Sequence, residues 1–126
     1  MSGIDRRRMV VGTASFVAVL AVPAPLLAAK VRPALFVFDS RIAHARDVAR
    51  AYRVTGVPVI DRERHDLGQA WRDRIPDLLQ ARGGPIAGLT MWVDSYICQT
   101  FGRECGLAMH RDGGARGDDL HAWVLS

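Results

Sequence analysis

The sequence predicts an α/β protein, a small three-layer sandwich with a mostly parallel sheet of about four to five strands. Three observations predict this fold. Short apolar runs alternate three times with segments of helical spacing, and the connections between them are short, as right-handed crossovers between parallel strands require. A last apolar run follows the glycine-rich loop from Gly113 to Gly117, and we expect it to be antiparallel, at the edge of the sheet.

The first strand and the first helix lie just after Pro33. Residues 34–40 (ALFVFDS) are nearly all apolar, which is typical of a strand buried on both faces of a parallel sheet. Residues 41–53 form a helical pattern with most of the arginines on the outer face. The expected inward stripe is Ile42, Ala45, Val48, Ala49 and Tyr52. Asp39 and Ser40 precede this helix, and both residue types are favourable N-caps.

The second strand and helix follow Gly56, which ends the first helix. Residues 57–61 (VPVID) are a short apolar run, and residues 66–82 have helical spacing. The apolar face of this second helical segment is Leu67, Ala70, Trp71, Ile75, Leu78 and Leu79. Pro76 should kink or divide the segment, because its ring removes a backbone donor.

The third unit begins with residues 85–92 (PIAGLTMW), and Asp94 or Ser95 is expected to cap the helix after it. One side of that helix contains Ile97, Phe101, Glu104, Cys105 and Ala108. Glu104 is a misfit there, which a partner or the helix edge must accommodate. Residues 107–111 and 120–126 are the remaining two strands.

The opening 29 residues have the three parts of an export signal. Arg6, Arg7 and Arg8 form a positive region, an apolar run follows, and Leu27-Ala28-Ala29 supplies the small residues of a cleavage site. We therefore divide the chain into a cleavable signal peptide, 1–29, and a single small domain, 30–126. An uncleaved membrane anchor through residues 9–28 is the alternative, and Gly12, Pro23 and Pro25 weaken it because they disfavour a helix.

The stretch from Asp5 to Val10 (DRRRMV) resembles a twin-arginine signal, with paired arginines, one variable residue and two apolar residues. The resemblance covers the leader alone. It implies that the protein folds before export, with the twin-arginine (Tat) translocase as its partner, and is periplasmic or secreted after cleavage. An ordinary secretory leader with three arginines is the other possibility.

Composition narrows the function classes. The formal net charge is +4, and the leader carries half of it, so the domain keeps about +2 with its signs interspersed. This balance disfavours nucleic-acid binding. Cys98 and Cys105 on one continuous helix would be separated by about 10 Å of rise, beyond the roughly 4.4–6.8 Å that a disulfide spans. We expect two small buried thiols, and no metal site or cofactor, because the spacing lacks a CxxC pair.

A strand order of 2-1-3 would place a crevice beyond the carboxyl ends of the first and third strands. Its rim holds the candidate ligand-binding residues Asp39, Ser40, Arg41, Trp92 and Asp94, with Thr90 and Ser95 beside them. The helix start and Arg41 suit a small anionic ligand, and Trp92 is placed to stack on it. The alternative is that Asp39 or Ser40 only caps the helix and Arg41 is solvated.

Two functions remain open. The first is an exported binding or accessory domain without catalysis, escorted with a larger exported enzyme. The second is a small periplasmic hydrolase-like enzyme in which Asp39 and Asp94 hold a cation or act as acid and base. Neither a GxSxG elbow nor a phosphate-loop glycine pattern is present.

Overall fold

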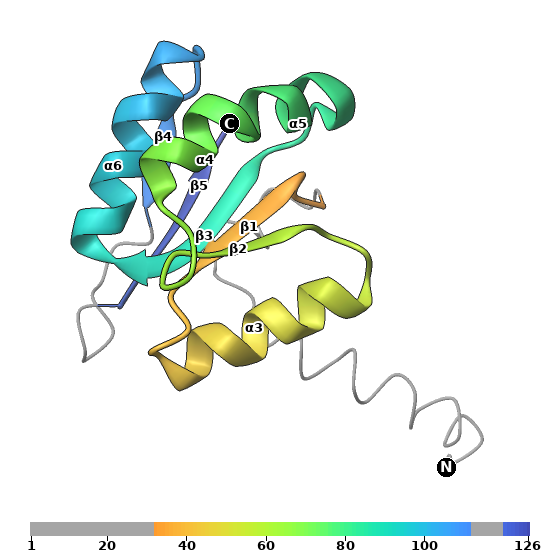
Figure 1. Cartoon of the computed structure of the whole chain (residues 1–126), viewed down its shortest axis with the longest axis vertical. Helices are drawn as coiled ribbons and strands as arrows, with labels where there is room; N and C mark the ends of the chain where they lie inside the picture. Colours follow the sequence, from red (N-terminus) through yellow and green to blue (C-terminus); the bar gives the residue numbers. More distant parts are fainter. Residues whose placement is uncertain (1–31, 112–119) are drawn as a thin grey trace.

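The computed structural model describes residues 32–111 and 120–126 of the 126-residue chain, and this part contains one five-stranded sheet and four helices (Figure 1). The strands are β1 (Leu35–Phe38), β2 (Val59–Asp61), β3 (Ile86–Met91), β4 (Met109–Arg111) and β5 (Leu120–Leu125). The helices are α3 (Ala43–Val54), α4 (Leu67–Asp73), α5 (Ile75–Arg82) and α6 (Trp92–Glu104). The predicted α/β class is confirmed. The predicted signal, with Arg6, Arg7 and Ala29, lies outside the described residues.

The strand order in the sheet is β2-β1-β3-β5-β4. Strand β1 is parallel to both β2 and β3, which confirms the order 2-1-3 for the first three strands. Strand β5 is antiparallel to β3 and β4, as expected for the last run. Its position differs from the prediction, because β4 pairs along its free side and forms the outer edge instead.

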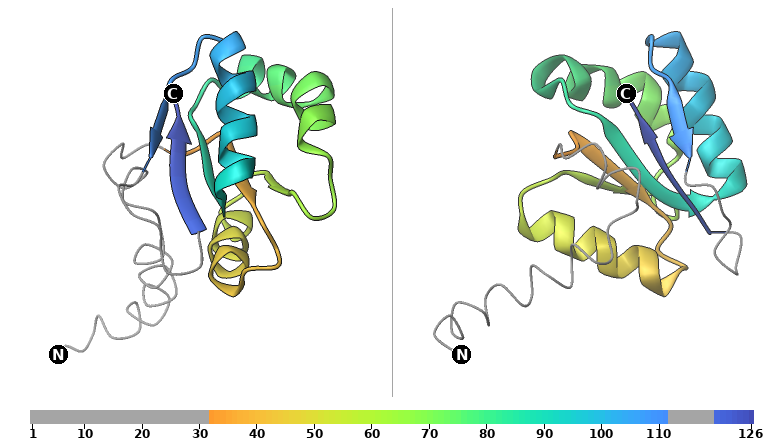
Figure 2. Two further views of the ribbon diagram at one scale, coloured as in Figure 1. Left: turned by 90° about the vertical axis from the view of Figure 1, so that its left-hand side faces the viewer. Right: turned by 180° about the vertical axis from the view of Figure 1, so that it is seen from behind.

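The two faces of the sheet bury different side chains. In β1, Phe36 and Phe38 belong to a cluster that includes the inward stripe of α3. Leu35 and Val37 point to the opposite face and pack in a second cluster with residues from α4, α5 and α6. All four residues are buried, as the continuous apolar run predicts for a strand covered on both sides. Figure 2 shows α6 lying alongside β3 and β5.

The first two helical predictions agree with the structure. Ala45, Val48 and Ala49 of α3 are buried, and Ile42 and Tyr52 pack against the same cluster. The second segment is divided into α4 and α5 at Arg74. Pro76 lies in the first turn of α5, where a missing backbone N–H costs nothing.

The face that α6 turns to the sheet is only partly the predicted one. Ile97 and Phe101 of the predicted side are partly buried against the second cluster. The buried residues of α6 are Asp94, Ser95, Cys98 and Gly102. Glu104 and Cys105 are exposed, because α6 ends at Glu104 and Cys105 is already its C-cap. The expected misfit of Glu104 therefore does not arise. Cys98 and Cys105 are both free thiols, and the prediction of burial is correct for Cys98 and wrong for Cys105.

Candidate functional site

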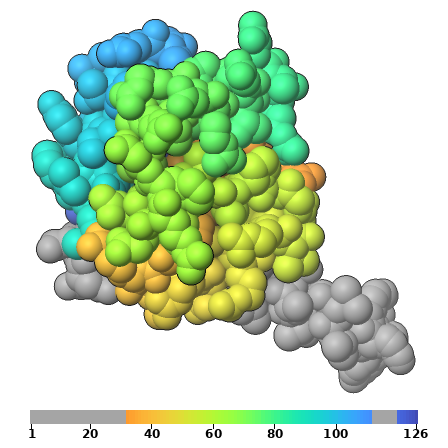
Figure 3. Space-filling view, in the orientation of Figure 1, coloured from red at the N-terminus to blue at the C-terminus, as the bar shows by residue number. Residues whose placement is uncertain are grey.

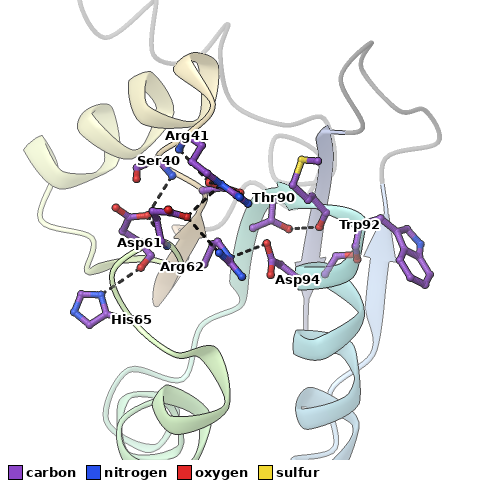
Figure 4. A network of polar contacts seen from close by, with 12 residues as sticks. Ser40, Arg41, Asp61, Arg62, His65, Thr90, Trp92 and Asp94 are labelled. Atoms are coloured by element: carbon purple, nitrogen blue, oxygen red, sulfur yellow. Dashed lines mark hydrogen bonds and ion pairs between the residues drawn. The ribbon is translucent and has the colours of Figure 1, made fainter.

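The carboxyl ends of β1, β2 and β3 meet in a network of ionised side chains, drawn in Figure 4. Asp39, directly after β1, is fully buried. Its Oδ1 accepts from the backbone N–H of Arg41 at 3.0 Å and from Arg41 Nε at 2.9 Å. Its Oδ2 accepts from Arg41 Nη2 at 2.6 Å. Asp39 and Arg41 of the DSR sequence therefore form a bidentate ion pair.

The Arg41 guanidinium determines the ionisation of Asp39. Its hydrogen bonds to the carboxylate hold the pKa of Asp39 below the ordinary value, and they outweigh the desolvation that burial imposes. The positive charge of Arg62 acts in the same direction. Asp39 is therefore a carboxylate over the whole neutral range.

Both capping predictions at this rim are wrong. Helix α3 begins at Ala43 with Ile42 as N-cap, and the side chain of neither Asp39 nor Ser40 caps its first backbone N–H groups. Helix α6 begins at Trp92 directly after β3, so Asp94 falls inside its first turn. Arg41 is not simply solvated either, since Asp39 binds it although 55% of its side chain is exposed.

Asp61, the last residue of β2, organises the second corner of the network. Its Oδ1 accepts from the backbone N–H groups of Ser40 at 3.1 Å and Glu63 at 3.0 Å. Ser40 is thereby fixed to the end of the neighbouring strand. The carboxylate of Glu63 lies 3.2 Å from Arg41 Nε and 3.4 Å from Arg62 Nη1. The turn after β2 therefore joins the β1 and β2 corners of the rim.

Asp94 and Arg62 form the third corner. Arg62 Nε lies 3.1 Å from Asp94 Oδ2, and Figure 4 shows the guanidinium reaching across to the start of α6. This contact is an ion pair, and the Arg62 Nε–H has no hydrogen-bond acceptor among the described residues. Among the described residues, no donor bonds to either oxygen of Asp94, although only 1% of its side chain is exposed.

Burial raises the pKa of Asp94 above its ordinary value by desolvating the charged form. The charge of Arg62 opposes this rise, and the nearby negative charge of Asp39 adds to it. The structure therefore brings Asp39 and Asp94 into one network, with their pKa values shifted in opposite directions.

Trp92 lies apart from this network. The residue is 52% exposed, and its ring stacks on Tyr96 with centroids 5.4 Å apart and points away from the rim in Figure 4. The other two rim residues are buried and bonded within the fold. Thr90 Oγ1 accepts from Trp123 Nε1 at 3.0 Å, and Ser95 Oγ donates to the Trp92 carbonyl at 2.7 Å.

A groove of about 400 Å³ opens on the other side of Ser40, between α3 and the outer strand β2. Both elements face the viewer in the space-filling view of Figure 3. The groove is lined by Phe38, Ser40, Arg46, Ala49, Arg50, Arg53, Val59, Asp61, Arg64 and His65. The described lining residues include four arginines and one carboxylate, so this part of the lining is positively charged.

The α3 wall of the groove carries three of its arginines on one stripe. Arg46, Arg50 and Arg53 are separated by four and three positions, the spacing that places helical residues on one face. Arg46 Nη1 donates to the Ser40 carbonyl at 2.6 Å, and Arg50 contacts the exposed Asp47 at 3.2 Å. Within the described residues, no carboxylate pairs with Arg53.

The sequence interpretation missed Asp61, Arg62 and this arginine stripe. It treated residues 62–66 as a solvated connection and the arginines of α3 as an outer face. A usable signal was present, because Asp61 ends an apolar run just as Asp39 does. The repeat of arginine at helical spacing in RDVARAYR was the second signal.

No protein-family model, curated protein or solved structure matches this chain significantly. Within residues 32–111 and 120–126, no helix has the length and apolar character to cross a bilayer. The same residues contain no group of three or more histidine, cysteine, aspartate or glutamate side chains placed to hold a metal ion.

Proposed function

We propose that this protein is an exported binding domain without catalysis, and that its ligand is anionic. The observation that carries the proposal is the groove between α3 and β2, where Arg46, Arg50, Arg53 and Arg64 line one concave surface. A volume of about 400 Å³ falls within the range of small-molecule sites. Guanidinium groups bind carboxylates and phosphates through paired N–H donors.

The charges within the groove support an anion over a cation. Asp61 is the one carboxylate among the described residues that line it, and backbone N–H groups of Ser40 and Glu63 already occupy its Oδ1. Arg64 Nε is 3.7 Å from Asp61 Oδ2, too far for a hydrogen bond. The described residues therefore neutralise these arginine side chains only in part.

The surroundings of the cysteine, serine and histidine side chains also support binding over catalysis. Burial raises the pKa of Cys98 to about 12, so its nucleophilic thiolate is scarce at neutral pH. Ser95 donates its hydroxyl to a backbone carbonyl. Within the described residues, His44 is exposed and no histidine bonds to a serine hydroxyl.

Calorimetric titration with citrate and with inorganic pyrophosphate tests the proposal. We expect millimolar or tighter binding of at least one probe, weakened at least tenfold in the Arg50→Gln/Arg53→Gln double variant. Arg103→Gln removes an exposed arginine of α6 outside the groove and serves as the control, with wild-type binding expected. The proposal fails if neither probe binds, or if the double variant binds as the control does.

The cellular context of this proposal rests on the leader. We propose cleavage of residues 1–29 after export through the Tat translocase, with residues 30–126 as one periplasmic or secreted domain in a three-layer arrangement. The two clusters on opposite faces of the sheet support the layer count. A larger exported enzyme is the candidate partner, and retention of residues 9–28 as an anchor is the alternative. Mass spectrometry of the protein from its own cell envelope distinguishes cleavage from retention.

A hydrolase-like enzyme is the second candidate, and the opposite pKa shifts of Asp39 and Asp94 favour it. Neighbouring carboxyl groups with separated pKa values are the usual arrangement of an acid and a base. Asp94 would be the proton donor, and Asp39 the permanently charged partner. This candidate requires that Asp94→Asn abolish turnover of an ester or phosphoester substrate without changing the folded structure.

A further inference from the structure

The groove has a second feature besides its charge, which is an edge of the sheet that no other described strand covers. Strand β2 is the outermost strand, with β1 on one side and no strand of the described chain on the other. The Arg62 N–H donates to the Phe38 carbonyl, and the Pro58 carbonyl accepts from the Phe36 N–H. Pro58 and Arg62, the residues on either side of β2, therefore direct backbone groups toward β1. Because this direction alternates along a strand, the backbone groups of Val59 point to the other side, the outer edge.

Val59 and Asp61 also line the groove. Val59 packs against the cluster under α3, and it is half-buried. The Asp61 carbonyl already accepts from the N–H groups of Arg64 and His65 in the turn that follows. The N–H and carbonyl of Val59 are thus the backbone pair at this edge that an added chain can reach.

Resting on the proposed function, we propose that the ligand is an extended acidic segment of a partner protein, added to the sheet beside β2. Such a segment pairs its backbone with Val59 and turns every second side chain toward α3. Side chains on one face of a strand recur at about 6.6 Å, and Arg46 and Arg50 are one helical turn apart, about 6 Å. Acidic residues at alternate positions therefore match successive arginines.

This match distinguishes a peptide from a compact anion. A citrate-sized molecule engages one or two guanidinium groups and has no use for the backbone of Val59. An extended segment uses the arginine stripe of α3 and the edge of β2 at the same time. The half-buried apolar side chain of Val59 suits the β-carbons of such a segment.

The test uses the ¹⁵N-labelled full chain and three synthetic heptapeptides. The first has aspartate at every second position, the second has the same composition with its aspartates contiguous, and the third is the first with N-methylated backbone amides. We expect the alternating peptide to bind at least tenfold more tightly than either of the others. We also expect its binding to slow hydrogen exchange of the Val59 amide at least tenfold.

Variants link this binding to the groove. The Arg50→Gln/Arg53→Gln double variant should lose at least tenfold in affinity for the alternating peptide, and Arg103→Gln should bind like the wild type. All three substitutions change exposed side chains, and equal melting temperatures would show that the variants fold.

The outcomes separate this inference from the proposed function. If citrate or pyrophosphate binds through Arg50 and Arg53 while the three peptides bind equally and Val59 exchange is unchanged, the extended segment is wrong and the anion site stands. Tighter binding of inorganic polyphosphate than of the alternating peptide would also overturn the inference. If the affinity for none of the probes depends on Arg50 and Arg53, both proposals are wrong.

Discussion

Arg62 Nε lies 3.1 Å from Asp94 Oδ2 and links the turn after β2 to the first turn of α6. The two residues are 32 positions apart in the chain, and strand β3 separates them in sequence. The charge on Asp94 has Arg62 as its counterion, yet both carboxylate oxygens lack a hydrogen-bond donor among the described residues. The ionic state of this corner of the rim is therefore sensitive to pH.

In the wild type, the free energy of unfolding should fall as the pH rises through the folded pKa of Asp94. Asp94→Asn should remove this fall. Because burial raises the pKa of Asp94, the folded protein holds the proton longer than the unfolded chain, whose value is about 3.9. The stabilisation is complete below that value and is lost as the pH rises through the folded pKa. Urea unfolding between pH 4 and 7 should show the decline in the wild type and not in Asp94→Asn.

The exposed Asp77 in the first turn of α5 provides a matched control, and Asp77→Asn should keep the wild-type profile. At neutral pH we expect Asp94→Asn to differ from the wild type by no more than about 2 kcal/mol, because losing the ion pair offsets the relief of burying a charge. An unchanged pH profile in Asp94→Asn would contradict this account.

Asp39→Asn should destabilise the protein at neutral pH by about 1 to 3 kcal/mol, because Arg41 loses a charged acceptor. The exposure of Arg41 favours the lower part of that range. The pKa of Asp39 is lowered in the folded protein, so its pH dependence is opposite to that of Asp94. The stabilisation is fully present above the unfolded pKa of about 3.9 and is lost as the pH falls through the folded pKa. Acid titration of unfolding should therefore show a shallower loss in the variant. An equal loss of stability with falling pH in the wild type and in Asp39→Asn would contradict this prediction.

Gly88→Ala should cost about 3 kcal/mol or more of unfolding free energy. A Cβ atom on Gly88 in β3 would lie 2.0 Å from Cζ2 of the fully buried Trp123 ring on β5. The ring is held by its hydrogen bond to Thr90, so the strands must separate to admit the methyl group.

Gly102→Ala is the comparison for that experiment. Its nearest contact would be the flexible end of Leu125 at 2.9 Å, and alanine is the better helix former by about 1 kcal/mol. We expect a clearly smaller loss, measured by thermal and urea unfolding of both variants. Equal losses would mean that the Trp123 ring moves more easily than its packing indicates.

One thiol should react in the folded protein and two after unfolding. Cys98 is fully buried, its thiol accepts from Trp71 Nε1 at 3.5 Å, and its pKa is raised to about 12. Cys105 is exposed at the end of α6. Labelling with a thiol reagent followed by mass spectrometry counts the reactive groups, and Cys105→Ser should leave none in the native state. Labelling of both residues in the folded wild type would contradict the buried position of Cys98.

The order of strands and helices could be predicted because local patterns encode it. The four residues of β1 are all apolar and buried. In α3, Ala45, Val48 and Ala49 recur at the helical period and are buried on one face. The division of the second helix followed from Pro76 alone. The inward face of α6 was not predictable in this way, because the close approach of Gly102 to Leu125 fixes its rotation.

Asp39 and Asp94 could be named as rim residues from the sequence, since carboxyl ends of parallel strands meet at one edge. Their partners could not. Arg62 reaches Asp94 from another strand, and Asp61 binds the backbone of Ser40 across 21 positions. Trp92 was expected to face the rim, but its place at the first residue of α6 directs the ring outward.

The sequence by itself determined the elements of this protein, their order and the parallel start of the sheet, because hydrophobic periodicity and turn residues act over a few positions. Only the tertiary structure decided which charges pair, that β4 and not β5 ends the sheet, and that three arginines of α3 line one groove with residues of β2. These features depend on contacts between residues far apart in the chain. Their energies are set by burial and distance, which no local pattern records.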